Sequence, residues 1–116
     1  MIQLYHNNRC GKSREALKML EDSGMEFETI RYLDNPPNIN QLREVLKKLN
    51  YKPLELVRQT EPIWIEKFKT IALSDGEIID ALVKYPRLIE RPILIDKDNA
   101  IVARTPEKVN EFILGF

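Results

Sequence analysis

The first third of the sequence places one helical pattern between two short segments of alternating polarity. The first alternating segment covers residues 2–5, the helical pattern covers residues 11–23, and the second alternating segment covers residues 26–32. Two consecutive strands joined by a helix pair in parallel, because the helix carries the chain back along the sheet before the second strand begins. The spacing therefore predicts a β-α-β unit, which ends at the turn-forming residues 34–37 (Asp-Asn-Pro-Pro).

The middle of the chain, about residues 38–88, reads mainly as helix. Apolar residues recur at helical intervals over 39–49, with Asn38 or Asn40 as the candidate N-cap. A Ser-x-x-Glu capping box at residues 74–77 predicts the start of another helix. Trp64 and Phe68, at helical spacing, fit a core better than a binding platform.

Strand patterns return in the last quarter of the chain. The predicted elements are a buried strand over 91–95, a turn at 96–99, a strand over 100–103 and a helix over 107–113. The complete order is β-α-β, a helical insertion, then β-β-α, which is the order of a thioredoxin-like fold. We therefore expect an α/β protein with a mixed four-stranded sheet, forming a single domain over residues 1–116 that contains the insertion.

The overall composition restricts the partners and the compartment. Eighteen basic residues balance eighteen acidic ones, so the charge gives no reason to expect nucleic acid or an anionic membrane as a partner. No apolar run approaches the roughly 20 residues of a membrane-spanning helix, and no signal peptide follows Met1. A single cysteine cannot form an internal disulfide, which favours a reducing compartment. We expect a cytoplasmic monomer.

That single cysteine, Cys10, lies where the first strand gives way to the first helix. The unpaired N–H groups and the positive end of the helix dipole favour the reactive thiolate there. Without this context, a lone cysteine is more often a small buried apolar residue. Ser13 occupies the position of the second cysteine of a Cys-x-x-Cys motif, so a redox cycle has to finish on a thiol of another molecule.

Several segments, in the same order along nearly the whole chain, carry a family resemblance. The sequence resembles the ArsC-type arsenate reductases of the glutaredoxin-coupled class, within the broader ArsC/Spx family. It is similar especially to the short subgroup, because the sequence stops at Phe116, and it departs at Asn8, where many relatives carry proline. The matching segments are Tyr5-His6-Asn7, Cys10-Gly11-Lys12-Ser13-Arg14, Tyr32–Pro37, Arg58 before Glu61-Pro62, Glu90-Arg91-Pro92-Ile93 and Ala103-Arg104-Thr105-Pro106.

The resemblance implies an oxyanion site around Cys10. It assigns three arginines, Arg58, Arg91 and Arg104, to the anion, and an arginine fork suits the edge of a tetrahedral oxyanion. Backbone amides at Gly11 and Lys12 can add donors, as helix starts do for phosphate. By the same resemblance Ser13 and His6 support the thiolate, although His6 taken alone fits a structural role better. Pro92 is the candidate cis-proline, and no metal site is expected.

The implied reaction uses one protein cysteine. Cys10 attacks arsenate, glutathione acts as co-substrate, and glutaredoxin regenerates the thiol, so no tightly bound cofactor is expected. Two other functions stay open. One is an Spx-like regulator that binds RNA polymerase, which Ser13, Arg58 and Arg104 disfavour. The other is an orphan thiol oxidoreductase that keeps the fold and the anion site but acts on another substrate.

Overall fold

The computed structural model describes residues 1–115, which form two compact units. The first unit contains Met1–Asn35 and the chain from Arg91 onward, and the second contains Pro36–Glu90. The second unit corresponds to the helical insertion expected at about residues 38–88. That the whole chain acts as a single domain stays a prediction.

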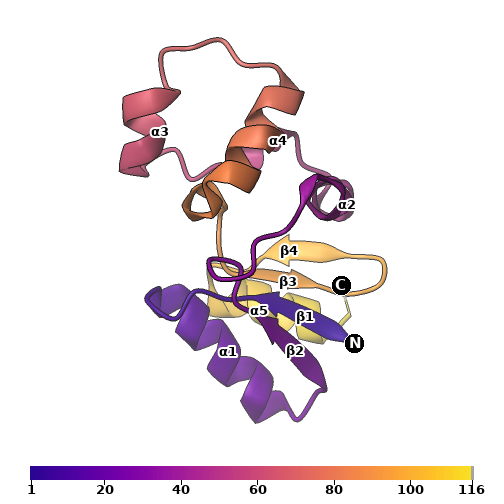
Figure 1. Cartoon of the computed structure of the whole chain (residues 1–116). Coiled ribbons are helices and arrows are strands. Elements are labelled where there is room, and N and C mark those ends of the chain that lie inside the picture. The colour runs from indigo at the N-terminus through magenta and orange to yellow at the C-terminus, as the bar shows by residue number, and fades with distance from the viewer. Residues whose placement is uncertain (116) are drawn as a thin grey trace. The chain divides into compact units, whose positions relative to one another are not determined.

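The first unit is built on a mixed four-stranded sheet (Figure 1). Its strands are β1 (Ile2–Tyr5), β2 (Phe27–Ile30), β3 (Ile93–Ile95) and β4 (Ala100–Val102), in the spatial order β2-β1-β3-β4. β1 runs parallel to β2 and antiparallel to β3, and β3 pairs antiparallel with β4. The predicted β-α-β and β-β-α order and the thioredoxin-like sheet are confirmed.

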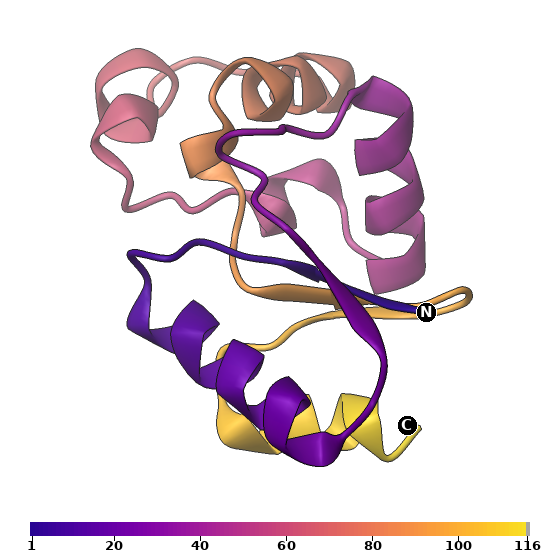
Figure 2. The same cartoon turned by 60° about the horizontal axis from the view of Figure 1, so that its bottom comes forward.

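Two helices, α1 (Gly11–Ser23) and α5 (Pro106–Ile113), pack against one face of this sheet, as Figure 2 shows. Gly24 is the C-cap of α1, and its positive φ of 73° suits a residue without a Cβ. Alternate residues of β1 face the helices because side chains of a strand point to opposite sides. The buried core of this face contains Ile2, Leu4, Ala16, Leu20, Leu94, Ala103, Val109 and Phe112.

β2 is shorter than the segment of alternating polarity that predicted it. The chain turns directly after Ile30, because the N–H groups of Asp34 and Asn35 both donate to the carbonyl oxygen of Arg31. Tyr32 is therefore not a strand residue, although it is fully buried, and its ring stacks on that of Tyr5 with the centroids 6.3 Å apart. The alternating pattern continues past the end of β2 because Tyr32 is buried in the turn, and a buried turn residue cannot be told from a buried strand residue by its polarity.

The second unit is helical. It contains α2 (Ile39–Leu49), η1 (Pro53–Leu56), α3 (Pro62–Lys67), α4 (Asp75–Lys84) and η2 (Pro86–Leu88), and α2 packs on α4. Of the two candidate caps, Asn38 is the N-cap of α2, and Ser74 and Glu77 form the predicted capping box of α4. Trp64 is buried, as expected of a core residue. Over residues 1–115, no helix has both the length and the apolar character needed to cross a membrane.

Candidate active site

Cys10 is the N-cap residue of α1, at the end of a tight loop that follows β1. Its N–H donates to the carbonyl oxygen of Asn7 at 3.0 Å, and its own carbonyl oxygen accepts from the N–H of Arg14 at 3.0 Å. The side chain of Asn7 accepts from the N–H of Arg9 at 2.9 Å. These bonds hold the loop in one shape and leave the thiol partly exposed at the start of the helix.

The hydroxyl of Ser13 links this loop to the first turn of α1. Ser13 Oγ lies 2.6 Å from Nδ1 of His6 and accepts from the N–H of Asn7 at 3.0 Å. Both partners precede Cys10 in the sequence, and both His6 and Ser13 are buried. Burial lowers the pKa of His6, and the charges of Arg31 and Arg14 act in the same direction. These surroundings therefore favour the neutral imidazole.

The surroundings of Cys10 favour its thiolate. Burial by itself would raise the pKa of the thiol, but the N–H of Ser13, the charge of Arg91 and the N–H of Lys12 together hold it below its ordinary value. A hydrogen bond from the Arg91 side chain acts in the same direction. Cys10 makes no capping hydrogen bond of good geometry through its side chain, so the amides act mainly through the field of their N–H dipoles.

This electrostatic environment predicts a low midpoint for alkylation of Cys10. The rate of reaction with iodoacetamide follows the thiolate fraction, so it should reach half its maximum clearly below the free-thiol value of about 8.5. Mass spectrometry over a pH series measures this rate at one site, because the chain has a single cysteine. Glutathione alkylated in the same buffers gives the reference. A midpoint equal to that of glutathione would contradict thiolate stabilisation by Arg91 and the helix start.

Arg91 is the cation that the structure brings to Cys10. Only 8% of the residue is exposed, and its Nε and Nη1 have no hydrogen-bond partner among residues 1–115. An unpaired buried donor is destabilising by roughly 1–3 kcal/mol, so a protein rarely retains one without a use. The unpaired donors of Arg91, close to the thiol, form a candidate site for an oxyanion.

Arg58 lies in the second unit, where it has a partner that the sequence analysis missed. Its Nη1 is 3.3 Å from Oε2 of Glu61, and Nη2 of Arg87 is 3.1 Å from the other oxygen of this carboxylate. Glu61 is buried, so two guanidinium groups share one desolvated charge. The three-residue spacing of Arg58 and Glu61 is the feature of the sequence from which this ion pair could have been predicted. A place for Arg58 on the same anion as Arg91 stays a prediction.

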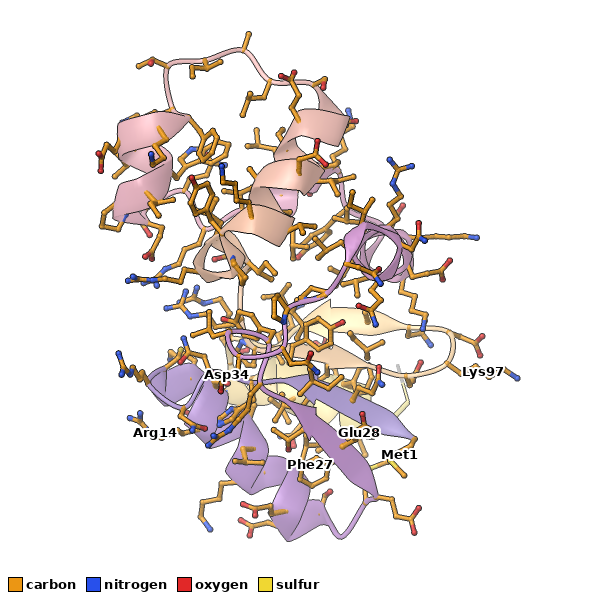
Figure 3. All side chains as sticks on the ribbon, in the orientation of Figure 1. Met1, Arg14, Phe27, Glu28, Asp34 and Lys97 are labelled. Carbon is orange, nitrogen blue, oxygen red and sulfur yellow. The ribbon has the colours of Figure 1, made fainter. Side chains whose placement is uncertain are left out.

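The remaining candidates lie at the expected positions in the chain. Gly11 and Lys12 form the first turn of α1, and the Arg91–Pro92 peptide bond is cis at the candidate cis-proline. Arg104 is exposed between β4 and α5, and its contact with the anion stays a prediction. Arg14 is exposed on α1 (Figure 3), where its Nη1 donates to the carbonyl oxygen of Asn8 at 2.9 Å. Among the described residues, no cluster of His, Cys, Asp and Glu could hold a metal ion.

The four-stranded sheet, with Cys10 at the start of its first helix, places the chain in the thioredoxin-like fold class. The buried arginine beside that cysteine, with its unpaired donors, adds a candidate site for an anion. The sequence model of the ArsC family matches residues 5–112, and the chain therefore belongs to the ArsC family.

Relatives and solved structures agree with this assignment. The chain is 40% identical over 114 residues to YfgD of Escherichia coli K12, an uncharacterized protein, covering 97% of the chain and 96% of the relative. It is 33% identical over 110 residues to the arsenate reductase of Neisseria meningitidis serogroup A, covering 93% and 94%. The structure of an arsenate reductase from Vibrio cholerae superposes with a TM-score of 0.89 at 34% identity, covering 95% of each chain.

Proposed function

We propose that this protein is an arsenate reductase that forms arsenite with glutathione and glutaredoxin as electron donors. The observation that carries the proposal is the pairing of a low-pKa thiol, Cys10, with the unpaired buried donors of Arg91. A nucleophile and an oxyanion-binding cation are the two components that attack on arsenate requires. We choose arsenate as the oxyanion because relatives that are 33% and 35% identical to the chain are named arsenate reductase.

In the first step the Cys10 thiolate attacks the arsenic(V) atom. A sulfur–arsenic bond forms, one arsenic–oxygen bond breaks, and the oxygen leaves as water after taking up a proton. Arsenic stays in the +5 state in this step. Arg91 donates hydrogen bonds to the oxygens of the anion and offsets their negative charge beside the thiolate. The N–H groups at the start of α1 add donors of the kind that bind phosphate at helix N-termini.

In the second step the thiolate of glutathione attacks the sulfur of Cys10. A sulfur–sulfur bond forms while the sulfur–arsenic bond breaks, and its electron pair stays on arsenic, which leaves as arsenite in the +3 state. Cys10 is then a mixed disulfide with glutathione. Because Cys10 is the single cysteine of the chain, no internal thiol can resolve this disulfide, and glutaredoxin removes the glutathione by thiol–disulfide exchange. In this proposal Arg104 also contributes donors to the anion.

The test is an assay of arsenite formation by the purified chain with arsenate, glutathione, glutaredoxin and a system that recycles oxidised glutathione. We expect arsenite to accumulate in step with the consumption of glutathione, and to require both glutathione and glutaredoxin. Omission of each donor in turn is the control. Arsenite formation that is no faster with the protein than without it would contradict the proposal.

A second thiol function uses the same residue, because a partly exposed thiol with a lowered pKa also suits thiol–disulfide exchange. In that function the same thiol exchanges with a glutathionylated protein, and arsenate is not a substrate. The assay separates the two functions when a glutathionylated peptide replaces arsenate. Release of glutathione from the peptide, without arsenite formation from arsenate, would favour the orphan thiol oxidoreductase.

A further inference from the structure

The charged residues of the first unit are distributed unevenly along its sheet. The unit has nine basic and ten acidic residues, so it carries no overall excess of positive charge. The strand register places Tyr5 beside both Ile30 and Ile93, so β1 and β2 end, and β3 begins, at the same end of the sheet. Cys10 lies at this end, because the loop that holds it follows β1. Basic residues collect at the same end.

Four exposed cations lie at this end, and we call them the cationic rim: Arg9, Lys12, Arg14 and Arg31. Arg9 and Lys12 flank the cysteine in the sequence, and Arg31 directly follows β2. Figure 3 shows Arg14 far from Lys97, which lies in the turn between β3 and β4 at the opposite end of the sheet. The rim therefore surrounds the thiol and not the whole of the first unit.

The cations of the rim have no carboxylate partners. Within residues 1–115, no ion pair involves a cation of the rim. Basic residues elsewhere in the first unit do form ion pairs: Nζ of Lys18 is 3.3 Å from Oδ2 of Asp22, and Nζ of Lys108 is 3.7 Å from Oε2 of Glu111. Positive charge is thus left uncompensated only where the chain also places its cysteine.

The start of α1 adds to this imbalance. Its first turn contains Lys12 and no acidic residue, whereas the first turns of α4 and α5 carry Asp75 and Glu107. The positive end of a helix dipole repels cations and attracts anions. Three carboxylates lie at this end of the sheet, those of Glu15, Asp34 and Glu107, and none of them pairs with the rim. An anion from another molecule would therefore relieve the repulsion.

Buried Arg91 is a separate indication that this end of the sheet takes anions. It lies two residues before β3, only 8% of it is exposed, and its Nε and Nη1 have no partner within residues 1–115. A buried guanidinium can serve a small oxyanion, but it is not open to a larger partner. The exposed rim suits negative charges carried by the molecule that exchanges sulfur with Cys10.

We propose that the cationic rim selects the sulfur partners of Cys10 by charge and favours thiols and disulfides that carry carboxylates near their sulfur. A cluster of one sign of charge raises the local concentration of oppositely charged reactants and their rate of encounter. Selection of the thiol that releases arsenite rests on the proposed function. Charge selection in exchange at Cys10 does not, because it needs no arsenate.

The exchange reaction is a direct measure of this selection. The Cys10 thiolate attacks one sulfur of a symmetrical disulfide, a new sulfur–sulfur bond forms, and the old one breaks. The other half leaves as a thiolate and takes up a proton from water, so no further oxidant or reductant is needed. Because Cys10 is the single cysteine, the mass of the whole chain reports the mixed disulfide at one site.

The test compares three disulfides with the whole chain at one pH: dithiodipropionate, which is anionic, hydroxyethyl disulfide, which is neutral, and cystamine, which is cationic. Each rate is divided by the rate of the same disulfide with 2-mercaptoethanol, which corrects for intrinsic reactivity. At low salt we expect the anionic disulfide to exceed the neutral one by about tenfold, and the cationic one to be slowest. In about 0.5 M salt the ratio should fall to about twofold, because salt screens exposed charges. Equal corrected rates, a faster cationic disulfide or a ratio that salt does not change would overturn the proposal.

Substitution of the rim identifies the residues responsible. The side chains of Arg9 and Lys12 form no ion pair within residues 1–115, so the double variant Arg9→Gln/Lys12→Gln should fold normally. We expect it to lower the ratio of anionic to neutral rates by about threefold or more. This ratio is independent of the thiolate fraction, since both rates use the same thiol. Lys97→Gln, at an exposed lysine at the opposite end of the sheet, is the matched control and should keep the ratio. An unchanged ratio in the double variant, or an equal fall in Lys97→Gln, would refute the role of the rim.

Discussion

Replacement of Cys10 by serine is expected to abolish arsenite formation, with a loss of roughly a thousandfold or more in rate. A serine hydroxyl is a far weaker nucleophile than a thiolate at neutral pH. It also cannot form the disulfide through which the electrons reach arsenic in the second step. Since the chain has no other cysteine, no neighbouring thiol can substitute. The rate of arsenite release, measured with saturating glutathione and glutaredoxin, is the readout.

Two controls separate lost chemistry from lost binding. The wild-type sequence alkylated at Cys10 should lose activity to the same extent as Cys10→Ser, because both changes remove the nucleophilic thiolate. Cys10→Ser should still bind arsenate or sulfate, since Arg91 and the amides of α1 are retained. Arsenite release by Cys10→Ser within tenfold of the unmodified rate would exclude Cys10 as the nucleophile. Equal loss of activity and of anion binding would point to a disturbed loop instead.

The thioredoxin-like order of elements could be predicted from local patterns. The helix α1 begins and ends where the sequence indicated, because its limits depend on neighbouring residues: Cys10 as N-cap and Gly24 at a positive φ. The capping box of α4 is local for the same reason. β2 was overextended, because the turn that ends it depends on backbone bonds to the carbonyl oxygen of Arg31, which residue polarity does not reveal.

The site was less predictable than the fold, because its contacts join residues far apart in the sequence. That the start of a helix favours the Cys10 thiolate could be inferred from neighbouring residues. The proximity of Arg91 to Cys10 depends on the sheet topology, and only the family resemblance indicated it. The bond between Ser13 Oγ and the His6 ring connects the two sides of the loop, and no periodicity encodes it. The pairing of Glu61 with Arg58 and Arg87 was missed because charged residues at such spacings are common on solvated surfaces.

Substitution of Arg91 by alanine is expected to weaken arsenate and sulfate binding by about 1–3 kcal/mol, the scale for losing hydrogen bonds to a charged group. It should also raise the pKa of Cys10, because the charge and the hydrogen bond of Arg91 both lower it. Calorimetric titration measures the first effect, and the pH dependence of alkylation measures the second. Arg43→Ala, at an exposed arginine of α2, is the matched control and should leave both unchanged.

The stability of the anion-free protein distinguishes a binding residue from a structural one. The Nε and Nη1 donors of Arg91 are buried without partners. Removing the guanidinium therefore removes the cost of burying these donors, and this gain offsets part of the stability lost with its packing contacts. We expect Arg91→Ala to change the free energy of unfolding by no more than about 1 kcal/mol without an anion. An anion at about a hundred times its dissociation constant should stabilise the unmodified protein by about 2.7 kcal/mol. The same concentration should stabilise Arg91→Ala far less. Equal stabilisation of both proteins in thermal unfolding would place the anion site away from Arg91.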